Sequence, residues 1–130
     1  MAGPENTFIA AVHRHLPADL YRMKNHNQFN GGIADVWYSG RKADMWVEYK
    51  FVVVPARSTT PIVFGLSALQ EEWLKSRHAE GRKVGVVVGC KAGGVWYPGV
   101  SWDTTHDANS FCAQIMSRTE LADIINNLVS

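Results

Sequence analysis

The alternation of apolar and polar residues predicts two β-strands joined by a turn between residues 31 and 51. The first strand is expected over residues 33–38, and a polar turn that contains Gly40 follows it. The second strand is expected from about Asp44 to Val54, and apolar residues occupy most of its odd and its even positions. Such a pattern is typical of a central strand that is covered on both faces.

Three charged residues interrupt these apolar segments. Asp35 shares one face of the first expected strand with Ile33 and Trp37, and Glu48 and Lys50 share one face of the second. Burying a charge costs several kcal/mol unless the charge is paired or binds a metal. The mismatch between charge and expected burial marks this segment as the candidate site.

The rest of the chain contains further helical and strand patterns, each bounded by proline, glycine or a capping residue. We expect a helix from Pro4 that ends at Pro17, an edge strand and loop over 20–30, a loop over 55–65, a helix over 67–80, strands over 83–89 and 95–98, and helices over 107–117 and 118–129.

The expected order is therefore helix, three strands, helix, two strands and C-terminal helices. The long connection between residues 54 and 84 contains a helix, which suits a crossover between two parallel strands. We predict an α/β fold with a central mixed sheet flanked by helices, formed by one domain over residues 1–130.

Composition limits the possible functions without selecting one. Apolar residues make up 46% of the chain and charged residues 19%, and the net charge is +1, so nucleic-acid binding would have to depend on local patches. No apolar run approaches the roughly 20 residues of a membrane span. The N-terminal residues lack a secretory pattern, and Cys90 and Cys112 are expected to be buried, reduced thiols, so we expect a cytoplasmic protein.

Two helices direct a polar residue to the expected core side. Glu5 precedes Phe8 and Ile9 by three and four residues, although it could simply complement the helix dipole. Gln70 shares the apolar side of its helix, although a capping box with Ser67 would also explain it. The expected apolar stripe beside Gln70 consists of Leu69, Trp73 and Leu74.

These residue types fit metal-dependent phosphodiester hydrolysis. Carboxylates are ligands suited to Mg²⁺, so Asp35 and Glu48 are candidate ligands, with the backbone carbonyl of Tyr49 as a third. Lys50 could orient the attacking water and stabilise the transition state. A Glu-x-Lys alone is weak evidence, because it arises by chance in roughly a third to a half of chains of this length.

The spacing of these residues resembles the PD-(D/E)xK nuclease superfamily, and within it the small stand-alone VRR-type (VRR-NUC) nucleases of phages and bacteria. One departure from the pattern is Ala34, which stands where a proline usually precedes the aspartate. The resemblance covers about residues 5–100 and leaves an extension of about 107–129 outside it. The matching positions are Glu5, Gly32, Asp35, Glu48, Lys50, Ser67, Gln70, Trp73, Gly81 and Val84 to Val88.

The resemblance implies a restriction-endonuclease-like core and a Mg²⁺-dependent DNA endonuclease, in which Mn²⁺ could replace Mg²⁺. It also implies a homodimer that cuts branched DNA such as Holliday junctions, in the host cytoplasm if a phage encodes it. Glu5 would bind the metal or its water, and Gln70 would support the site. Trp96, Tyr97, Trp102 and the last helices either form the dimer surface or pack in the core.

DNA contacts and alternative functions remain open at this stage. Arg57 is the first candidate for phosphate binding because its loop follows the strand with Glu48 and Lys50, and the other candidates are Arg41, Lys42, Lys75 and Arg77. One alternative is a flap-, nick- or end-directed or non-specific nuclease. Another is a non-catalytic DNA-binding module on a nuclease fold. A third, a nuclease with His26 as base, lacks the necessary partner residues.

Overall fold

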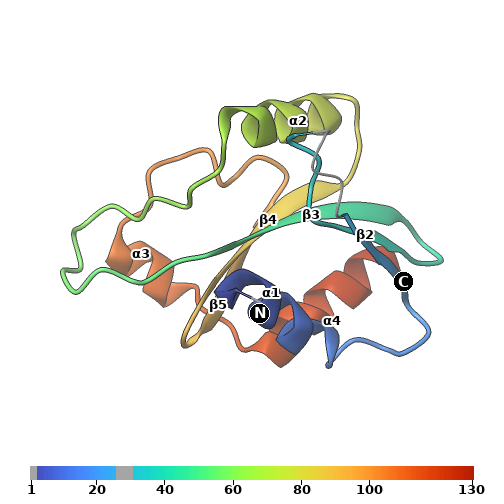
Figure 1. Cartoon of the computed structure of the whole chain (residues 1–130), viewed down its shortest axis with the longest axis horizontal. Coiled ribbons are helices and arrows are strands. Elements are labelled where there is room, and N and C mark those ends of the chain that lie inside the picture. Colours follow the sequence, from blue (N-terminus) through green and yellow to red (C-terminus); the bar gives the residue numbers. More distant parts are fainter. Residues whose placement is uncertain (1–2, 26–30) are drawn as a thin grey trace.

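The computed structural model describes residues 3–25 and 31–130. Within them, the strands form one mixed sheet in the order β1-β2-β3-β4-β5 (Figure 1). The strands are β1 (Tyr21–Lys24), β2 (Val36–Ser39), β3 (Asp44–Phe51), β4 (Val84–Cys90) and β5 (Gly93–Pro98). The helices are α1 (Pro4–His13), α2 (Ala68–Ala79), α3 (Ala108–Ala113) and α4 (Arg118–Val129).

The pairing of the strands confirms the predicted mixed α/β architecture. β3 and β4 are parallel, whereas the pairs β1–β2, β2–β3 and β4–β5 are antiparallel. The connection between β3 and β4 contains α2, which lies across the sheet as the expected crossover helix (Figure 1). β3 and β4 therefore form the centre of the sheet, and β1 is an edge strand as predicted.

Helices cover both faces of the sheet. On one face, α1 and α4 pack against a core of odd-numbered β3 residues, namely Met45, Val47 and Tyr49. On the other face, α2 and α3 pack against even-numbered β4 residues with Val52, Tyr97 and Trp102. Because both C-terminal helices contribute buried side chains, including Phe111 and Leu121, they are part of the core that covers the sheet.

Capping residues determine where the helices begin. Ser67 and Ser117 each form a complete capping box with the residue three positions later, and Asp107 caps α3 through its side chain. All three sites satisfy backbone N–H groups that the first turn of a helix leaves free. The capping box at Ser67, which the sequence indicates, is confirmed.

Several predicted boundaries are wrong by a few residues. β2 begins at Val36 rather than residue 33. The reason is that the backbone N–H of Tyr49 in β3 donates to the side chain of Asp35 and not to a backbone carbonyl of β2. β3 ends at Phe51 rather than Val54, because β4 ends one residue after Gly89, the partner of Phe51. α1 ends at His13, before Pro17, and α3 ends at Ala113. The part of the expected 20–30 segment at residues 26–30, including His26, lies outside the described residues.

Two residues expected in the core are exposed. Leu69 is 58% exposed, because it lies above the turn at Gly32 rather than against the sheet. Cys112 is exposed, whereas Cys90 is buried as expected. Among the described residues, no helix is long and apolar enough to cross a bilayer.

A polar network lies within the core between α1 and the sheet. His13 Nε2 is 2.8 Å from the Tyr38 hydroxyl, which is 2.5 Å from the Tyr49 hydroxyl. Burial, followed by the charges of Arg22 and Lys24, lowers the pKa of His13 to about 4. The folded protein therefore holds His13 neutral near pH 7, and its protonation is disfavoured until the pH falls to about 4.

This shift predicts a pH-dependent contribution to stability. Because the folded pKa of about 4 lies below the ordinary 6.5, the contribution is complete above pH 6.5 and is lost as the pH falls toward 4. His13→Gln can still form a hydrogen bond with Tyr38 but does not titrate. As the pH falls from 6.5 toward 4, the free energy of unfolding of this variant should therefore decrease less than that of the wild type. The measurement is urea unfolding at pH 7, 6, 5 and 4.5. His15→Gln, which alters an exposed histidine, is the control. Equal slopes for the His13 variant and the wild type would contradict the prediction.

Candidate active site

The candidate site lies where β2 and β3 stop pairing, a feature we call the β2–β3 split. Paired residues run from Ser39 with Asp44 to Val36 with Val47, and beyond Val47 only β4 pairs with β3. Asp35 lies at this point, and its Oδ2 accepts a hydrogen bond of 3.0 Å from the backbone N–H of Tyr49. The Asp35 carboxylate thus takes the place of a backbone acceptor from β2, and this hydrogen bond holds it against β3.

The backbone carbonyl of Tyr49 also faces the β2–β3 split. The N–H groups of Trp46 and Val52 donate to Lys83 and Gly89, so even-numbered β3 residues direct their backbone groups toward β4. In a strand, the backbone groups of successive residues alternate between the two edges. The backbone groups of Tyr49 therefore point toward Asp35, as its N–H demonstrates.

Glu48 is the buried charged residue of the described chain. Its side chain is 1% exposed, and its Oε2 accepts a 3.0 Å hydrogen bond from Gln70 Nε2. Lys50 Nζ lies 3.5 Å from the same oxygen. The other oxygen, Oε1, is buried without a hydrogen-bond partner. An unpaired buried carboxylate oxygen is costly, which is typical of a position kept for a ligand.

Gln70 combines the two roles that the sequence left as alternatives. Its Oε1 accepts from the backbone N–H of Ser67 at 2.9 Å, and its own N–H donates to Ser67 Oγ at 3.1 Å. Its Nε2 remains free to donate to Glu48. The capping box therefore fixes the amide orientation, and the amide in turn fixes Glu48.

A glycine turn brings the segment before Asp35 close to α2. Gly32 has φ +96°, a conformation that side chains disfavour, and a Cβ there would lie 2.5 Å from the Leu69 carbonyl oxygen. The turn therefore packs directly on the first turn of α2. Asp35 and Gln70 are placed on the same side of the sheet by this contact.

Burial and neighbouring carboxylates raise the pKa values of Glu48 and Glu5. Burial, followed by the charge of Asp35, raises the pKa of Glu48 to about 9, and Lys50 offsets only part of the shift. Burial and Asp35 also raise the pKa of Glu5, while Lys50 and Lys24 oppose that change. Glu5 at the start of α1 therefore belongs to the same electrostatic cluster.

The oxygen donors fit a divalent cation, although the side chains alone do not enclose one. No group of three histidine, cysteine, aspartate or glutamate side chains within residues 3–25 and 31–130 is arranged to hold a metal. Asp35, Glu48 and the Tyr49 carbonyl nevertheless offer hard oxygen atoms at the split, and Glu48 Oε1 is unpaired. Mg²⁺ commonly uses one or two carboxylates and keeps several waters, so this donor set suits it.

The basic residues expected to contact DNA are scattered. Lys75 pairs with Asp103 at 3.1 Å, and Arg77 pairs with Glu80 at 3.0 Å. Arg41 and Lys42 are exposed in the β2–β3 turn. Lys42 precedes Glu48 by six residues, which corresponds to about 20 Å between them at ~3.3 Å per residue of extended chain. Exposed Arg57 follows β3. The structure thus gathers Asp35, Glu48, Lys50, Glu5 and Gln70 but not these cations.

Aromatic packing beside the acidic residues was not foreseen. Trp37 stacks on Trp46 with ring centroids 6.1 Å apart, and Trp46 contacts Trp73 edge-on at 5.5 Å. Trp37 is two residues from Asp35, and Trp46 is two residues from Glu48, so they share a face of the sheet. This two-residue spacing was the signal in the sequence.

Comparisons with known proteins agree with the architecture. No protein-family model matches the sequence, and no curated protein matches it. Among solved structures, the chain is similar to the Holliday junction resolvase Hjc of Archaeoglobus fulgidus, an archaeal hyperthermophile, with a TM-score of 0.56 and 16% sequence identity. The match covers 91% of this chain and 99% of that chain.

The chain has the restriction-endonuclease-like fold. Because the match covers nearly the whole of both chains, it extends beyond residues 5–100 and includes part of the C-terminal helical segment. At this level of identity the similarity concerns the fold. The site residues must therefore be judged by their own geometry.

The raised pKa of Glu48 predicts that this site costs stability in the metal-free protein. A carboxyl group whose folded pKa is about 9 stabilises the fold fully below pH 4.5, and that contribution is lost as the pH rises toward 9. Glu48→Gln should therefore raise the free energy of unfolding at pH 8 by roughly 0.5–2 kcal/mol, the common range for stabilising substitutions. Urea unfolding in EDTA measures it, with exposed Glu72→Gln as control. A destabilised Glu48 variant at pH 8 would contradict the prediction.

Proposed function

We propose that this protein is a divalent-metal-dependent DNA endonuclease of the PD-(D/E)xK superfamily and of the VRR type. The observation that carries the proposal is the arrangement at the β2–β3 split, where Asp35, buried Glu48 and the Tyr49 carbonyl face a common region beside Lys50. Glu48 Oε1 is also buried without a hydrogen-bond partner in the described structure, which supports a ligand at this position.

Each side chain has a role that follows from its contacts. Asp35, held by the Tyr49 N–H, and Glu48, held by Gln70, would bind the cation together with the Tyr49 carbonyl. Mg²⁺ would acidify the attacking water and neutralise charge on the phosphate. Lys50 donates its protons toward the nucleophile and the phosphate oxygens, where negative charge develops.

Glu5 completes the site from the opposite helix. Burial, followed by the charge of Asp35, raises the pKa of this carboxyl group beside Asp35 and Lys50, so it accepts a proton more readily than an ordinary glutamate. Glu5 therefore accepts a hydrogen bond from the attacking water or binds the cation. In-line attack by this water leaves a 5′-phosphate and a 3′-hydroxyl.

The proposed substrate is branched DNA, including the Holliday junction. Support comes from the fold shared with the archaeal Hjc, which is a Holliday junction resolvase. Cutting two strands of a four-way junction calls for two sites, so we propose a homodimer. Tyr97 and Trp102 are buried within the core, which removes them from the candidate dimer surface.

Substitutions at the split should abolish cleavage without unfolding the protein. Asp35→Asn loses a ligand charge and Lys50→Ala loses the cation beside the nucleophile, so each should reduce the cleavage rate by roughly 10²-fold or more. The measurement is Mg²⁺-dependent cleavage of a labelled four-way junction, with folding checked by circular dichroism. Asp44→Asn, in the distant hairpin, is the matched control. Normal cutting by the Asp35 or Lys50 variant would refute the site.

The non-catalytic alternative has a separate readout. Calorimetric titration of the wild type with Mn²⁺ should show uptake that Asp35→Asn reduces, because Asp35 supplies one of the proposed ligands. A DNA-binding module without a metal site would show no such uptake.

Substrate choice separates the remaining nuclease alternatives. A junction-selective dimer should cut four-way DNA faster than linear duplex, nicked or flapped DNA of the same sequence, because only the junction presents two equivalent strands to two sites. The measurement is initial cleavage rates on this panel in Mg²⁺. Equal rates on all substrates would refute junction selectivity and leave the nuclease itself intact.

A further inference from the structure

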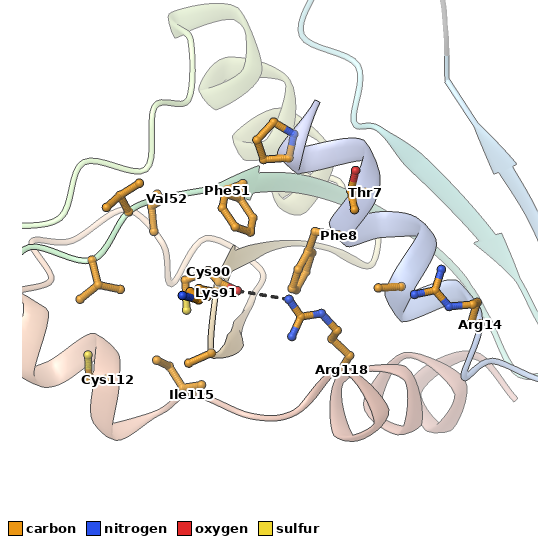
Figure 2. A pocket seen from close by; sticks show the side chains of 15 residues that line it. Thr7, Phe8, Arg14, Phe51, Val52, Cys90, Lys91, Cys112, Ile115 and Arg118 are labelled. Carbon is orange, nitrogen blue, oxygen red and sulfur yellow. Dashed lines mark hydrogen bonds between the residues drawn. The ribbon is translucent and has the colours of Figure 1, made fainter. Parts of the chain in front are cut away.

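A large groove lies on the α1 face of the sheet, and Figure 2 shows the side chains that line it. Its volume is about 1080 Å³, just above the roughly 300–1,000 Å³ typical of ligand pockets. Its walls come from α1, the end of β3 with the three valines that follow, the β4–β5 turn, α3 and the start of α4. The groove therefore has room for a ligand longer than a single side chain.

The charge of the groove is entirely positive. Arg14, Lys91 and Arg118 line it, and no aspartate or glutamate does. In the described part of the chain, none of the three cations forms an ion pair with a carboxylate. The whole protein has a net charge of only +1, so this concentration of cations is local. Such a surface complements a polyanion.

The floor of the groove is aromatic and aliphatic. Phe51 and Phe8 lie with ring centroids 6.1 Å apart, and the Arg118 guanidinium lies 5.1 Å from the centre of the Phe8 ring. Val53 is 90% exposed at the edge of this floor. Aromatic rings interleaved with arginine are a platform on which unpaired bases stack irrespective of sequence.

The groove adjoins the proposed active site through shared elements. Phe51, in its wall, directly follows Lys50 on β3, and because their side chains leave opposite faces of the strand, the groove and the site meet around the end of β3. Pro4 and Thr7, also in its wall, flank Glu5 on α1. A strand whose phosphate reaches the β2–β3 split would meet the groove within the next nucleotides.

We propose that this groove binds unpaired nucleotides of a branched DNA substrate beside the cleaved bond. Arg14, Lys91 and Arg118 would contact the backbone phosphates, and the floor at Phe51 and Val53 would take bases that leave the stack at a branch. The inference rests on the proposed nuclease function and names the feature of the substrate that the site selects. The positive lining and the shared elements favour DNA over an apolar protein segment, which would leave three cations unpaired.

The first test measures phosphate contacts by their salt dependence. Arg14→Ala with Lys91→Ala is made in the Asp35→Asn background, which leaves the DNA uncut. Losing two contacts at ~0.7 per phosphate for single strands should reduce the salt slope by about 1.4 and the affinity roughly 25-fold at 0.1 M salt. The substrate is a fork with single-stranded arms. The matched control, Arg22→Ala with Arg82→Ala, removes two cations that do not line the groove and should change little.

The second test uses the exposed thiol of Cys112 as a reporter within the groove. Forked DNA should slow its alkylation by a maleimide several-fold, whereas duplex of equal length should not, and buried Cys90 should stay unreactive. Cys112→Ser with Asn127→Cys moves the reporter to an exposed position of α4 outside the groove lining, where forked DNA should give no protection.

The outcomes separate the groove from the active site. If the wild type cuts forked DNA but the Arg14 and Lys91 variant binds it normally, or loses no more affinity than the control pair, the groove assignment is wrong and the nuclease stands. Absence of protection at Cys112 also overturns the assignment. If these substitutions alter self-association and not DNA affinity, the occupant is a second copy of the chain. If the wild type binds no DNA at all, the proposed function itself fails.

Discussion

The hydrogen bond from the Tyr49 N–H to the Asp35 carboxylate is the contact on which the candidate site depends. At this point the ladder between β2 and β3 ends, and an unpaired N–H in the centre of the sheet would be costly. Asp35 satisfies it with a side chain and so carries a negative charge into the sheet. The same contact keeps the Asp35 carboxylate beside Glu48 and directs the Tyr49 carbonyl to the split, where both could bind a cation. The structural solution to a sheet that splits would thereby also supply two of the metal ligands that we propose.

Glu48 shows what such a site costs. Two carboxylates close together in a poorly hydrated region raise the pKa of Glu48 to about 9, and Lys50 and Gln70 compensate only one of its oxygens. A fold under no functional constraint would place an apolar residue here, as it does at Trp46 and Val52 on the same face. A bound divalent cation would lower the pKa of Glu48 again, because it favours the ionised form of both carboxylates.

The two faces of the sheet divide the proposed work. Gln70 and the tryptophans support Glu48 from the α2 face, while α1 brings Glu5 to the split and forms one wall of the positive groove. Chemistry and strand binding thus share α1 and β3. A displacement of α1 relative to the sheet would affect both, and the His13–Tyr38–Tyr49 network holds α1 to the two strands that flank the split.

The sequence alone was sufficient for the order of elements, the parallel crossover and the residues of the acidic cluster. These depend on local patterns: apolar periodicity, Ser67 and Ser117 as caps, and charges within apolar strands. It could not place the end of β2, because that end is decided by a side chain accepting a bond from the neighbouring strand. The exposure of Leu69 and Cys112, the ion pairs of Lys75 and Arg77, and the gathering of Arg14, Lys91 and Arg118 around one groove also depend on contacts between distant segments. Local sequence patterns therefore determined which residues are candidates. Only the tertiary structure decided which of them lie in contact, because contact depends on where the sheet splits and on how the helices pack against it.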